Sequence, residues 1–560
     1  MSFVNDAFAF VFAFVFLLGL LIFVHELGHF LVARACGVRV LKFSLGFGPP
    51  LGFGRYRLTW TRGHTQYVVA WFPLGGFVKM LGENLDEADD PSLAAHPEEA
   101  LSHKPTWQKL AVVFAGPVMN LVFPVVVFMI ILAIGVPRPT PVIGTVEPGS
   151  PAALAGLRPG DAIERIDDEP LTWWADFGDQ VRTRPGEALQ VSYRRDEQIL
   201  DTVLEVGERP SFDEFGIRVD VGWIGAGHSR LSAALGVPSS ESPAARAGLH
   251  SGDVVEAVAD APVEDWDAFS AAYAVARGPV TLQVQRGEGD AAETLRFEVP
   301  ALGDIAKLGI VPGSVLISSV TSDSPAQRGG LASGDLILSV DGDPVWSFAS
   351  FAETVRTSEG RILDLAFARG GEVQRVSIAP ELDSRGMGLG IEESHYLVGI
   401  SAKVQTLMGS LAIDRQTNSL IALPRAVGMT VELTHTFLRG FGKLITGEVP
   451  AKQVAGPIGI AVVTARAIEH GWETYLSIMV LISINLGILN LLPIPILDGG
   501  QAVIFAIEGV RRAPLSLRTR EIFQQVGLTV LVLVMGLAFW NDLSQQGARL
   551  IQWLRAPPGS

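Results

Sequence analysis

Two histidines and a glutamate stand together in a stretch that otherwise has the composition of a membrane span, where residues 25 to 29 read H-E-L-G-H. On a helix, His25 and His29 are four residues apart and project from one face, so both can bind one metal ion. Glu26 lies beside them as a candidate general base. Because ionisable side chains are costly in hydrocarbon, their presence there indicates function. The motif therefore predicts a metal site with an adjacent base inside the membrane.

A catalytic zinc ion normally takes three protein ligands and leaves a fourth position for water. No suitable third ligand follows His29 in the same helix. A later apolar segment ends in N-L-L-P-I-P-I-L-D-G-G, from Asn490 to Gly500, where two prolines break the helix at membrane depth and Asp498 follows. In isolation Asp498 could be a cap or turn residue at the membrane surface. Joined to the histidine motif, it is the expected third ligand.

The elements that must position these residues are membrane helices. The chain has 560 residues, of which 48% are hydrophobic, so it is long enough for several domains and too apolar to be wholly soluble. Four uncharged segments approach or exceed the ~20 residues that a membrane-spanning helix needs. They cover roughly 7–24 continuing through the motif, 110–137, 474–497 and 522–541. The first lacks a positive n-region and a small-residue cleavage site, so we expect a permanent helix.

Charge gives the expected orientation and excludes one class of partner. Basic residues are concentrated between the first and second spans and between the third and fourth, which places both connections in the cytoplasm by the positive-inside rule. Both termini and the insert 138–473 then lie on the other side. The net charge of −16 argues against binding of nucleic acid, and the single cysteine, Cys36, excludes internal disulfides. The basic residues are Arg34, Arg39, Lys42, Arg55, Arg57, Arg62, Lys79, Lys104, Lys109, Arg511, Arg512, Arg518 and Arg520.

The insert repeats one phrase three times, S-P-A-x-x-x-G-L-x-x-G-D, beginning at Ser150, Ser242 and Ser324. A Gly-Ile pair follows the aspartate of each phrase after 55, 56 and 55 residues. This repetition predicts three homologous domains, each with a short helix over a small sheet. The phrase resembles circularly permuted PDZ domains of bacterial envelope proteases. The resemblance implies peptide binding by strand addition, and spacers or steric screens are the alternative.

Together, the H-E-L-G-H motif, the N-x-x-P-x-P-x-L-D-G motif and the PDZ-like insert resemble the site-2 protease family of intramembrane zinc metalloproteases. The likeness extends over nearly the whole chain. It departs from the family in having three PDZ-like repeats, where the best-known relatives have two. Further matching segments are Gly46–Pro49, Pro73–Met80, Gly116–Pro117 with Asn120, and Gly442–Gly447.

The resemblance implies a role for each site residue. His25, His29 and Asp498 hold Zn²⁺, Glu26 is the base, and Asn485 and Asn490 hold the substrate. For the two asparagines, hydrogen bonding between helices is the alternative.

The resemblance also implies a membrane-dipping β-hairpin at 55–80 that pairs with the substrate, with an ordinary cytoplasmic hairpin as the alternative. The amphipathic segment 427–445 is expected along the membrane surface, or else as a docking helix for the PDZ-like units.

The expected fold is a polytopic α-helical membrane protein with four transmembrane helices, a membrane-associated β-hairpin and three inserted PDZ-like α+β domains. The expected parts are 1–138, 139–223, 224–312, 313–394, 395–473 and 474–560, of which the second to fourth are the PDZ-like domains.

The expected function is cleavage of single-span membrane proteins in the bilayer of the bacterial inner membrane, after a first extracytoplasmic cut. The resemblance implies anti-sigma factors and remnant signal peptides as substrates, screened by PDZ-like units in the periplasm. The alternatives are a membrane-anchored PDZ scaffold or chaperone with a vestigial zinc site, and a protein with a structural zinc only. The presence of all three ligands and of Glu26 argues against both.

Overall fold

The computed structural model describes residues 2–54, 56–83, 96–213, 217–287, 289, 292–383, 395–402, 406–448, 456–513 and 515–555, with backbone only for 2–11, 73–74, 517 and 544–555. The chain divides into two compact units. Unit 1 combines Met1–Val136, Gly386–Glu392 and Arg415–Ser560, and unit 2 combines Pro137–Arg385 and Glu393–Asp414.

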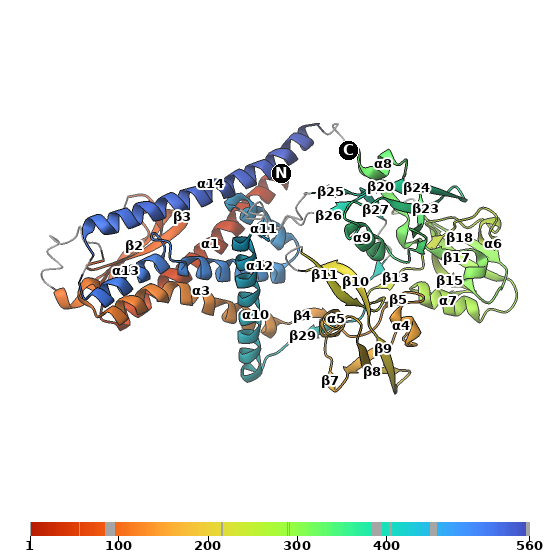
Figure 1. Ribbon diagram of the computed structural model, residues 1–560, viewed down its shortest axis with the longest axis horizontal. Helices are drawn as coiled ribbons and strands as arrows, with labels where there is room; N and C mark the ends of the chain where they lie inside the picture. Colours follow the sequence, from red (N-terminus) through yellow and green to blue (C-terminus); the bar gives the residue numbers. More distant parts are fainter. Residues whose placement is uncertain are drawn as a thin grey trace. The chain divides into compact units, whose positions relative to one another are not determined.

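Unit 1 is built on helices, and α3 is the helix against which α1, α10, α12 and α13 pack (Figure 1). Four segments are long and apolar enough to cross a membrane, as expected: Phe12–Ala35, Thr106–Ile134, Trp472–Leu491 and Arg518–Leu543. The third ends at Leu491 rather than at 497, because two prolines follow. The helices are α1 (Ser2–Ala35), α3 (Thr106–Ile134), α10 (Ser419–Thr446), α11 (Pro457–Glu469), α12 (Trp472–Leu491), α13 (Asp498–Arg511) and α14 (Leu517–Arg555), with short 3-10 turns η2 (Pro97–Glu99) and η3 (Leu101–His103).

Between α1 and α3 the chain forms an antiparallel sheet of β1 (Val40–Pro50), β2 (Thr59–Arg62) and β3 (Thr65–Met80). The long strand β3 lies on both sides of β1, because Phe43 pairs with Tyr67 in its first half and with Val78 in its second. β2 pairs with the first half. Among the described residues, the second half of β3 has no strand partner on its other side and packs on α1 instead.

Helix α10 is longer than the amphipathic segment 427–445. Ala422 and Ala426 are buried and pack with residues of α3 and α12 in one hydrophobic cluster, while Leu420, Val431 and Ile445 are exposed. Small residues at the contact allow close approach of the helices. Its expected position along the membrane surface stays a prediction.

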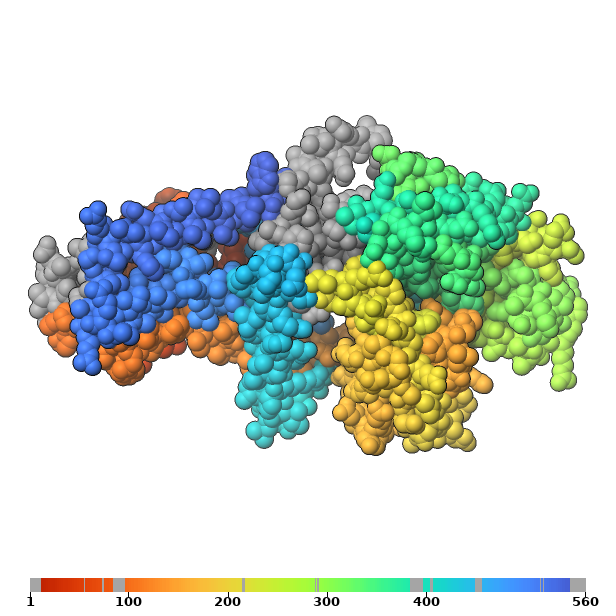
Figure 2. All heavy atoms as spheres, in the orientation of Figure 1, coloured from red at the N-terminus to blue at the C-terminus, as the bar shows by residue number. Residues whose placement is uncertain are grey.

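Unit 2 contains three successive repeats, each with a four-stranded antiparallel sheet and two helices (Figure 1). The first has the sheet β7-β6-β8-β9, the second β16-β15-β17-β18 and the third β22-β21-β23-β24. In the space-filling view the three stretches are coloured orange to yellow, light green and green to teal (Figure 2).

The bounds of these sheets and of their helices follow in chain order. The first repeat has α4 (Pro151–Leu154), β6 (Ala162–Ile166), β7 (Glu169–Pro170), α5 (Trp174–Arg182), β8 (Ala188–Arg195) and β9 (Gln198–Glu205). The second has α6 (Pro243–Arg246), β15 (Val254–Val258), β16 (Ala261–Pro262), α7 (Trp266–Ala274), β17 (Val280–Arg286) and β18 (Glu293–Val299). The third has α8 (Pro325–Arg328), β21 (Leu336–Val340), β22 (Asp343–Pro344), α9 (Phe348–Arg356), β23 (Leu363–Arg369) and β24 (Glu372–Ile378).

Each repeat is closed by a strand pair that joins its two ends. β5 (Thr145–Val146) pairs with β12 (Ala226–Gly227), β14 (Leu235–Gly236) with β19 (Val311–Pro312), and β20 (Ile317–Val320) with β27 (Ile400–Ala402). The predicted limits 139–223, 224–312 and 313–394 stay predictions. Smaller elements are β4 (Val136–Pro139), β10 (Gly207–Phe212), β11 (Arg218–Trp223), β13 (Arg230–Leu231), η5 (Ile305–Leu308), η6 (Gly313–Val315), β25 (Glu381–Asp383), β26 (His395–Leu397), β28 (Thr406–Leu407) and β29 (Leu411–Asp414).

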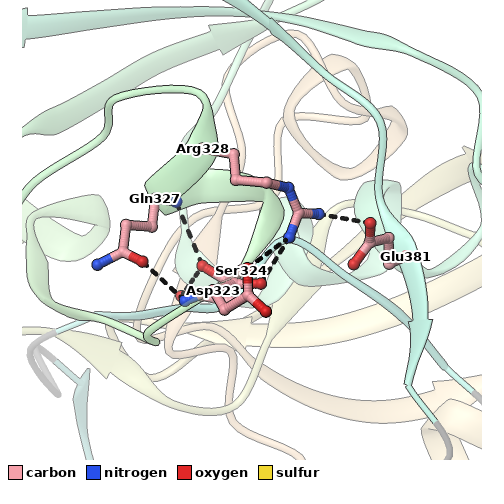
Figure 3. Close-up of polar contacts among 6 residues, drawn as sticks. Asp323, Ser324, Gln327, Arg328 and Glu381 are labelled. Atoms are coloured by element: carbon pink, nitrogen blue, oxygen red, sulfur yellow. Dashed lines mark hydrogen bonds and ion pairs between the residues drawn. The ribbon is translucent and has the colours of Figure 1, made fainter.

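The repeated S-P-A phrase starts a short helix in every repeat. In the third, Ser324 Oγ accepts a hydrogen bond from the backbone N–H of Gln327, and Pro325 occupies the first turn, where no N–H is needed (Figure 3). Arg328 of the same helix pairs with Glu381 (Figure 3). The alanine of each phrase, such as Ala326, has 0% exposure and packs into the repeat's core.

The last residue of the phrase is a buried aspartate that forms a bidentate ion pair. Asp253 is 1% exposed, and both of its carboxylate oxygens lie 2.7 Å from guanidinium nitrogens of Arg286. The same guanidinium donates to the carbonyl of Gly248, which closes the loop of the phrase. Asp161 with Arg195 and Asp335 with Arg369 repeat this arrangement.

In each repeat a glycine packs on the serine that opens the repeated phrase. Gly309 follows η5 directly, and a Cβ there would lie 2.6 Å from Cβ of Ser242. Gly225 and Gly399 pack on Ser150 and Ser324 in the same way. The first and third repeats have the additional strand pairs β10–β11 and β25–β26 before the packed glycine; their pairs at 215–217 and 389–391 lie wholly or partly outside the described residues.

Candidate active site

The two histidines lie near the end of α1, where small residues let α3 approach closely. A Cβ on Gly28 would lie only 2.3 Å from the backbone oxygen of Ala115. A Cβ on Gly116 would lie 2.3 Å from His29 Nε2. Glycine at both positions is therefore what allows the backbones of the two helices and the imidazole rings to occupy the same small volume.

Asp498 reaches the histidines because of the break after α12. The helix ends at Leu491, and α13 begins at Asp498 after a short turn containing Pro493 and Pro495. Gly499 and Gly500 make the turn compact, because a Cβ at either would lie within 2.3 Å of a backbone oxygen of the preceding turn. The first turn of α13 thus presents the carboxylate toward α1.

The three predicted ligands converge. His25 Nε2 lies 3.1 Å from Asp498 Oδ2, His29 Nε2 lies 3.5 Å from Asp498 Oδ1, and the two Nε2 atoms are 3.2 Å apart. One ligand atom from each of the three residues lies within 4.8 Å of the other two. His29 Nδ1 lies 2.8 Å from the carbonyl oxygen of Val112, which can only accept, so Nδ1 carries the proton and Nε2 its lone pair. Two imidazole nitrogens and a carboxylate oxygen fit the ligand preferences of zinc.

Glu26 lies between the metal-binding residues and the sheet. Its carboxylate interacts electrostatically with His25, His29 and Asp498 and with the backbone of Val78. A Cβ on Gly76 would lie 3.1 Å from Glu26 Cγ. The second half of β3 therefore passes directly beside the candidate base.

The two predicted substrate-binding asparagines lie on α12. Asn490 is in the last turn of the helix, just before the break that leads to Asp498, and Asn485 lies farther from this end. Both are partly buried. The Oδ1 atom of Asn485 is buried without a hydrogen-bond partner within the described part of the chain.

Three contributors to this site were not singled out for a role from the sequence: the Val112 carbonyl, Gly116 and Asn120. They lie four residues apart on α3 and form one stripe of the helix, facing the two histidines. This spacing is the signal that could have identified them, and it becomes meaningful only once α3 is known to pack on α1.

A second cluster of possible ligands also lies within 4.8 Å, counting one ligand atom from each residue. It consists of His96, Glu98 and Glu99. It lies at the surface, and Glu99 pairs with Arg39. Such exposed acidic groups are common without a metal, and we assign it no chemistry.

The model of Peptidase family M50 matches residues 13–534, so the chain belongs to this family of membrane proteases. It is 33% identical to Protease RseP of Yersinia pestis over 537 residues, covering 95% of this chain and 98% of that one. It is 32% identical to the Regulator of sigma-E protease RseP of Escherichia coli over 546 residues, covering 97% and 100%. A relative in Neisseria meningitidis that bears the name of a zinc metalloprotease is 30% identical, with 95% and 98% covered. The chain is accordingly a zinc-dependent intramembrane protease.

Proposed function

We propose that this protein hydrolyses peptide bonds in transmembrane segments of single-span membrane proteins, at a zinc site formed by His25, His29 and Asp498. The observation that carries the proposal is the convergence of these three side chains from α1 and the first turn of α13. A zinc ion held by these residues would polarise the scissile carbonyl and make a water molecule a better nucleophile. Three ligands suit a catalytic rather than a closed structural site.

Glu26 is the proton carrier in this proposal. It accepts the proton of the attacking water and returns it to the leaving amine. Glu26 lies beside Gly76 and Val78 of β3. Both residues belong to the second half of this strand, which has no strand partner on its other side among the described residues. This free edge supports a role for the backbone of β3 in binding substrate. A substrate segment that has unwound into an extended conformation can add to this edge as a further strand.

Asn485 and Asn490 hold the backbone of the unwound substrate. A peptide unwound in the membrane exposes amide groups that need hydrogen-bond partners. The unpartnered Oδ1 of Asn485 is an acceptor available for such an amide. The sheet of β1, β2 and β3 dips into the membrane interface in this proposal. The exposed aromatic side chains Phe53, Trp60 and Phe72 in this part of the chain support that position.

The substrate class follows from the resemblance of the site and from the names of the relatives. We propose anti-sigma factors and remnant signal peptides, cut after a first protease has removed the extracytoplasmic part. The protein lies in a bacterial inner membrane, with the zinc site toward the cytoplasm and the PDZ-like units in the periplasm. These units screen substrates.

The test uses a tagged single-span protein, in full-length and pretrimmed forms, co-expressed with the wild type or with His29→Ala. Cleavage of the pretrimmed form alone, with a new terminus inside the apolar segment by mass spectrometry, is the expected result. It should be absent with His29→Ala. Cleavage in a soluble loop, or equal cleavage by the variant, would overturn the proposal.

A further inference from the structure

One ring nitrogen of His25, Nδ1, does not face the other two proposed zinc ligands, His29 and Asp498. Its role described below rests on the proposed role of His25 as a zinc ligand. His25 Nδ1 lies 3.3 Å from the side-chain amide of Asn120, and both residues are buried. His29 has the backbone oxygen of Val112 at the equivalent place. Each histidine therefore has one polar partner behind its ring, and both partners come from α3.

The two partners differ in the hydrogen-bonding groups that they can present to the imidazole ring. A carbonyl oxygen can only accept, whereas an amide presents either its NH₂ group or its oxygen to His25 Nδ1. With the NH₂ group toward the ring, Nδ1 must accept and Nε2 carries the proton, which removes the lone pair that a metal needs. In that orientation the Oδ1 atom of Asn120 is buried without a hydrogen-bond partner in the described structure.

Rotation of the amide by 180° restores the lone pair that a metal needs. Oδ1 then accepts the Nδ1–H of His25, and Nε2 is left with its lone pair directed toward Asp498 and His29. We propose that Asn120 is a positioning residue, whose amide oxygen holds His25 in the tautomer that binds zinc. Metal-binding histidines generally donate their second N–H to such an acceptor, which fixes the tautomer and ring orientation.

The surroundings of Asn120 fix its backbone. Residue 124 is a proline, so the carbonyl of Asn120 lacks its usual intrahelical donor. The hydroxyl of Ser483 on α12 donates to this carbonyl at 2.8 Å. Asn120 is 0% exposed and cannot turn toward solvent. The residue that orients His25 is thereby tied to the helix that leads to Asp498.

The test measures zinc affinity by chelator competition on the full chain in detergent, rather than activity. Asn120→Leu keeps the side-chain size and removes the acceptor, and we expect zinc affinity to fall about 10–100-fold. Asn120→Asp restores an acceptor and should bind zinc within about threefold of the wild type. Ser483→Ala is the matched control, because it removes a buried hydrogen bond at the same residue and leaves the amide in place; its affinity should be unchanged.

Two results would overturn the inference: wild-type affinity in Asn120→Leu, or equal losses in Asn120→Leu and Asn120→Asp. If Asn120→Leu folds poorly, Asn120→Asp still tests the inference, because a loss of zinc affinity of about tenfold or more in a folded Asn120→Asp contradicts the role of the acceptor. His25→Ala separates this inference from the proposed function. Loss of zinc in His25→Ala but not in Asn120→Leu contradicts the role of Asn120 alone, whereas retention of zinc in both contradicts the proposed zinc site.

Discussion

At the scale of single residues, the site depends on side chains that are small as much as on those that bind. The two histidine ligands and the neighbouring base were predicted from spacing, because residues four apart on a helix share a face. Gly116 and the Val112 carbonyl were not, because their importance arises from the packing of α3 on α1. A sequence does not state which carbonyl will face which imidazole when two helices meet.

Gly116→Ala tests this close packing. The added Cβ would lie 2.3 Å from His29 Nε2 and 2.8 Å from His25 Cε1, so the rings must move. Overpacking of this kind costs about 1–3 kcal/mol, and we expect zinc affinity to fall at least about tenfold. Gly19→Ala is the control, since it lies in the same span as the histidines and a Cβ there meets nothing within 4 Å. Equal zinc affinity in the two variants would contradict the packing argument.

At the scale of elements, the sequence predicted the four apolar spans and the repeated S-P-A phrase well, because both depend on local composition. It predicted the end of the third span less well, since the helix stops at Leu491 once two prolines follow. The arginine partners of the buried aspartates were not predicted. Each lies on a strand 33 or 34 residues after its aspartate, and only the sheet brings the two together.

Arg286→Met tests the buried ion pair of the second repeat. It leaves the carboxylate of Asp253 buried and without its guanidinium, so we expect this repeat to lose about 3 kcal/mol or more of stability. Faster hydrogen exchange of amides in β15 and β17 of the full chain measures the loss. Arg296→Met, at an exposed pair with Asp260 in the same repeat, should change exchange little. Equal effects of the two substitutions would show that burial is not the cause.

Asp542→Ala tests the contact between α14 and α11. This carboxylate, 3% exposed, accepts from the backbone N–H groups of Gly456, Ile458 and Gly459 at the start of α11. Its removal leaves these donors unpaired and should cost about 1–3 kcal/mol. We expect faster hydrogen exchange in the first turn of α11, with a smaller change for Asp542→Asn, which keeps one acceptor. Unchanged exchange in Asp542→Ala would refute the role of this cap.

At the scale of the whole molecule, the sequence predicts that catalysis and substrate screening belong to different parts of the chain. The structure divides into two compact units. The proposed catalytic residues all lie in unit 1, and the three repeats all lie in unit 2. The proposed sides of the membrane rest on the distribution of basic residues. The closing of the repeats depends instead on strand pairs such as β20 with β27, between residues 80 to 85 positions apart.

Removal of the repeats tests their proposed role in screening. Thr140 donates from its backbone to the carbonyl of Ser410 at 2.9 Å, and Arg138 pairs with Asp414 at 3.1 Å, so the two ends of the insert lie together. Deletion of residues 141–409 with a short glycine linker preserves these contacts. We expect the deleted protein to cleave substrates that retain their extracytoplasmic domain. Continued strict dependence on prior trimming would contradict the screening role.

The central claim is that Glu26 moves the proton at a zinc site within the membrane. The most direct measurement compares zinc content and cleavage of a pretrimmed single-span substrate for the purified wild type and Glu26→Gln. We predict equal zinc content, with cleavage lowered by at least about a hundredfold in the variant, because general-base catalysis contributes about 10²–10⁴. Equal cleavage by both proteins would contradict the account.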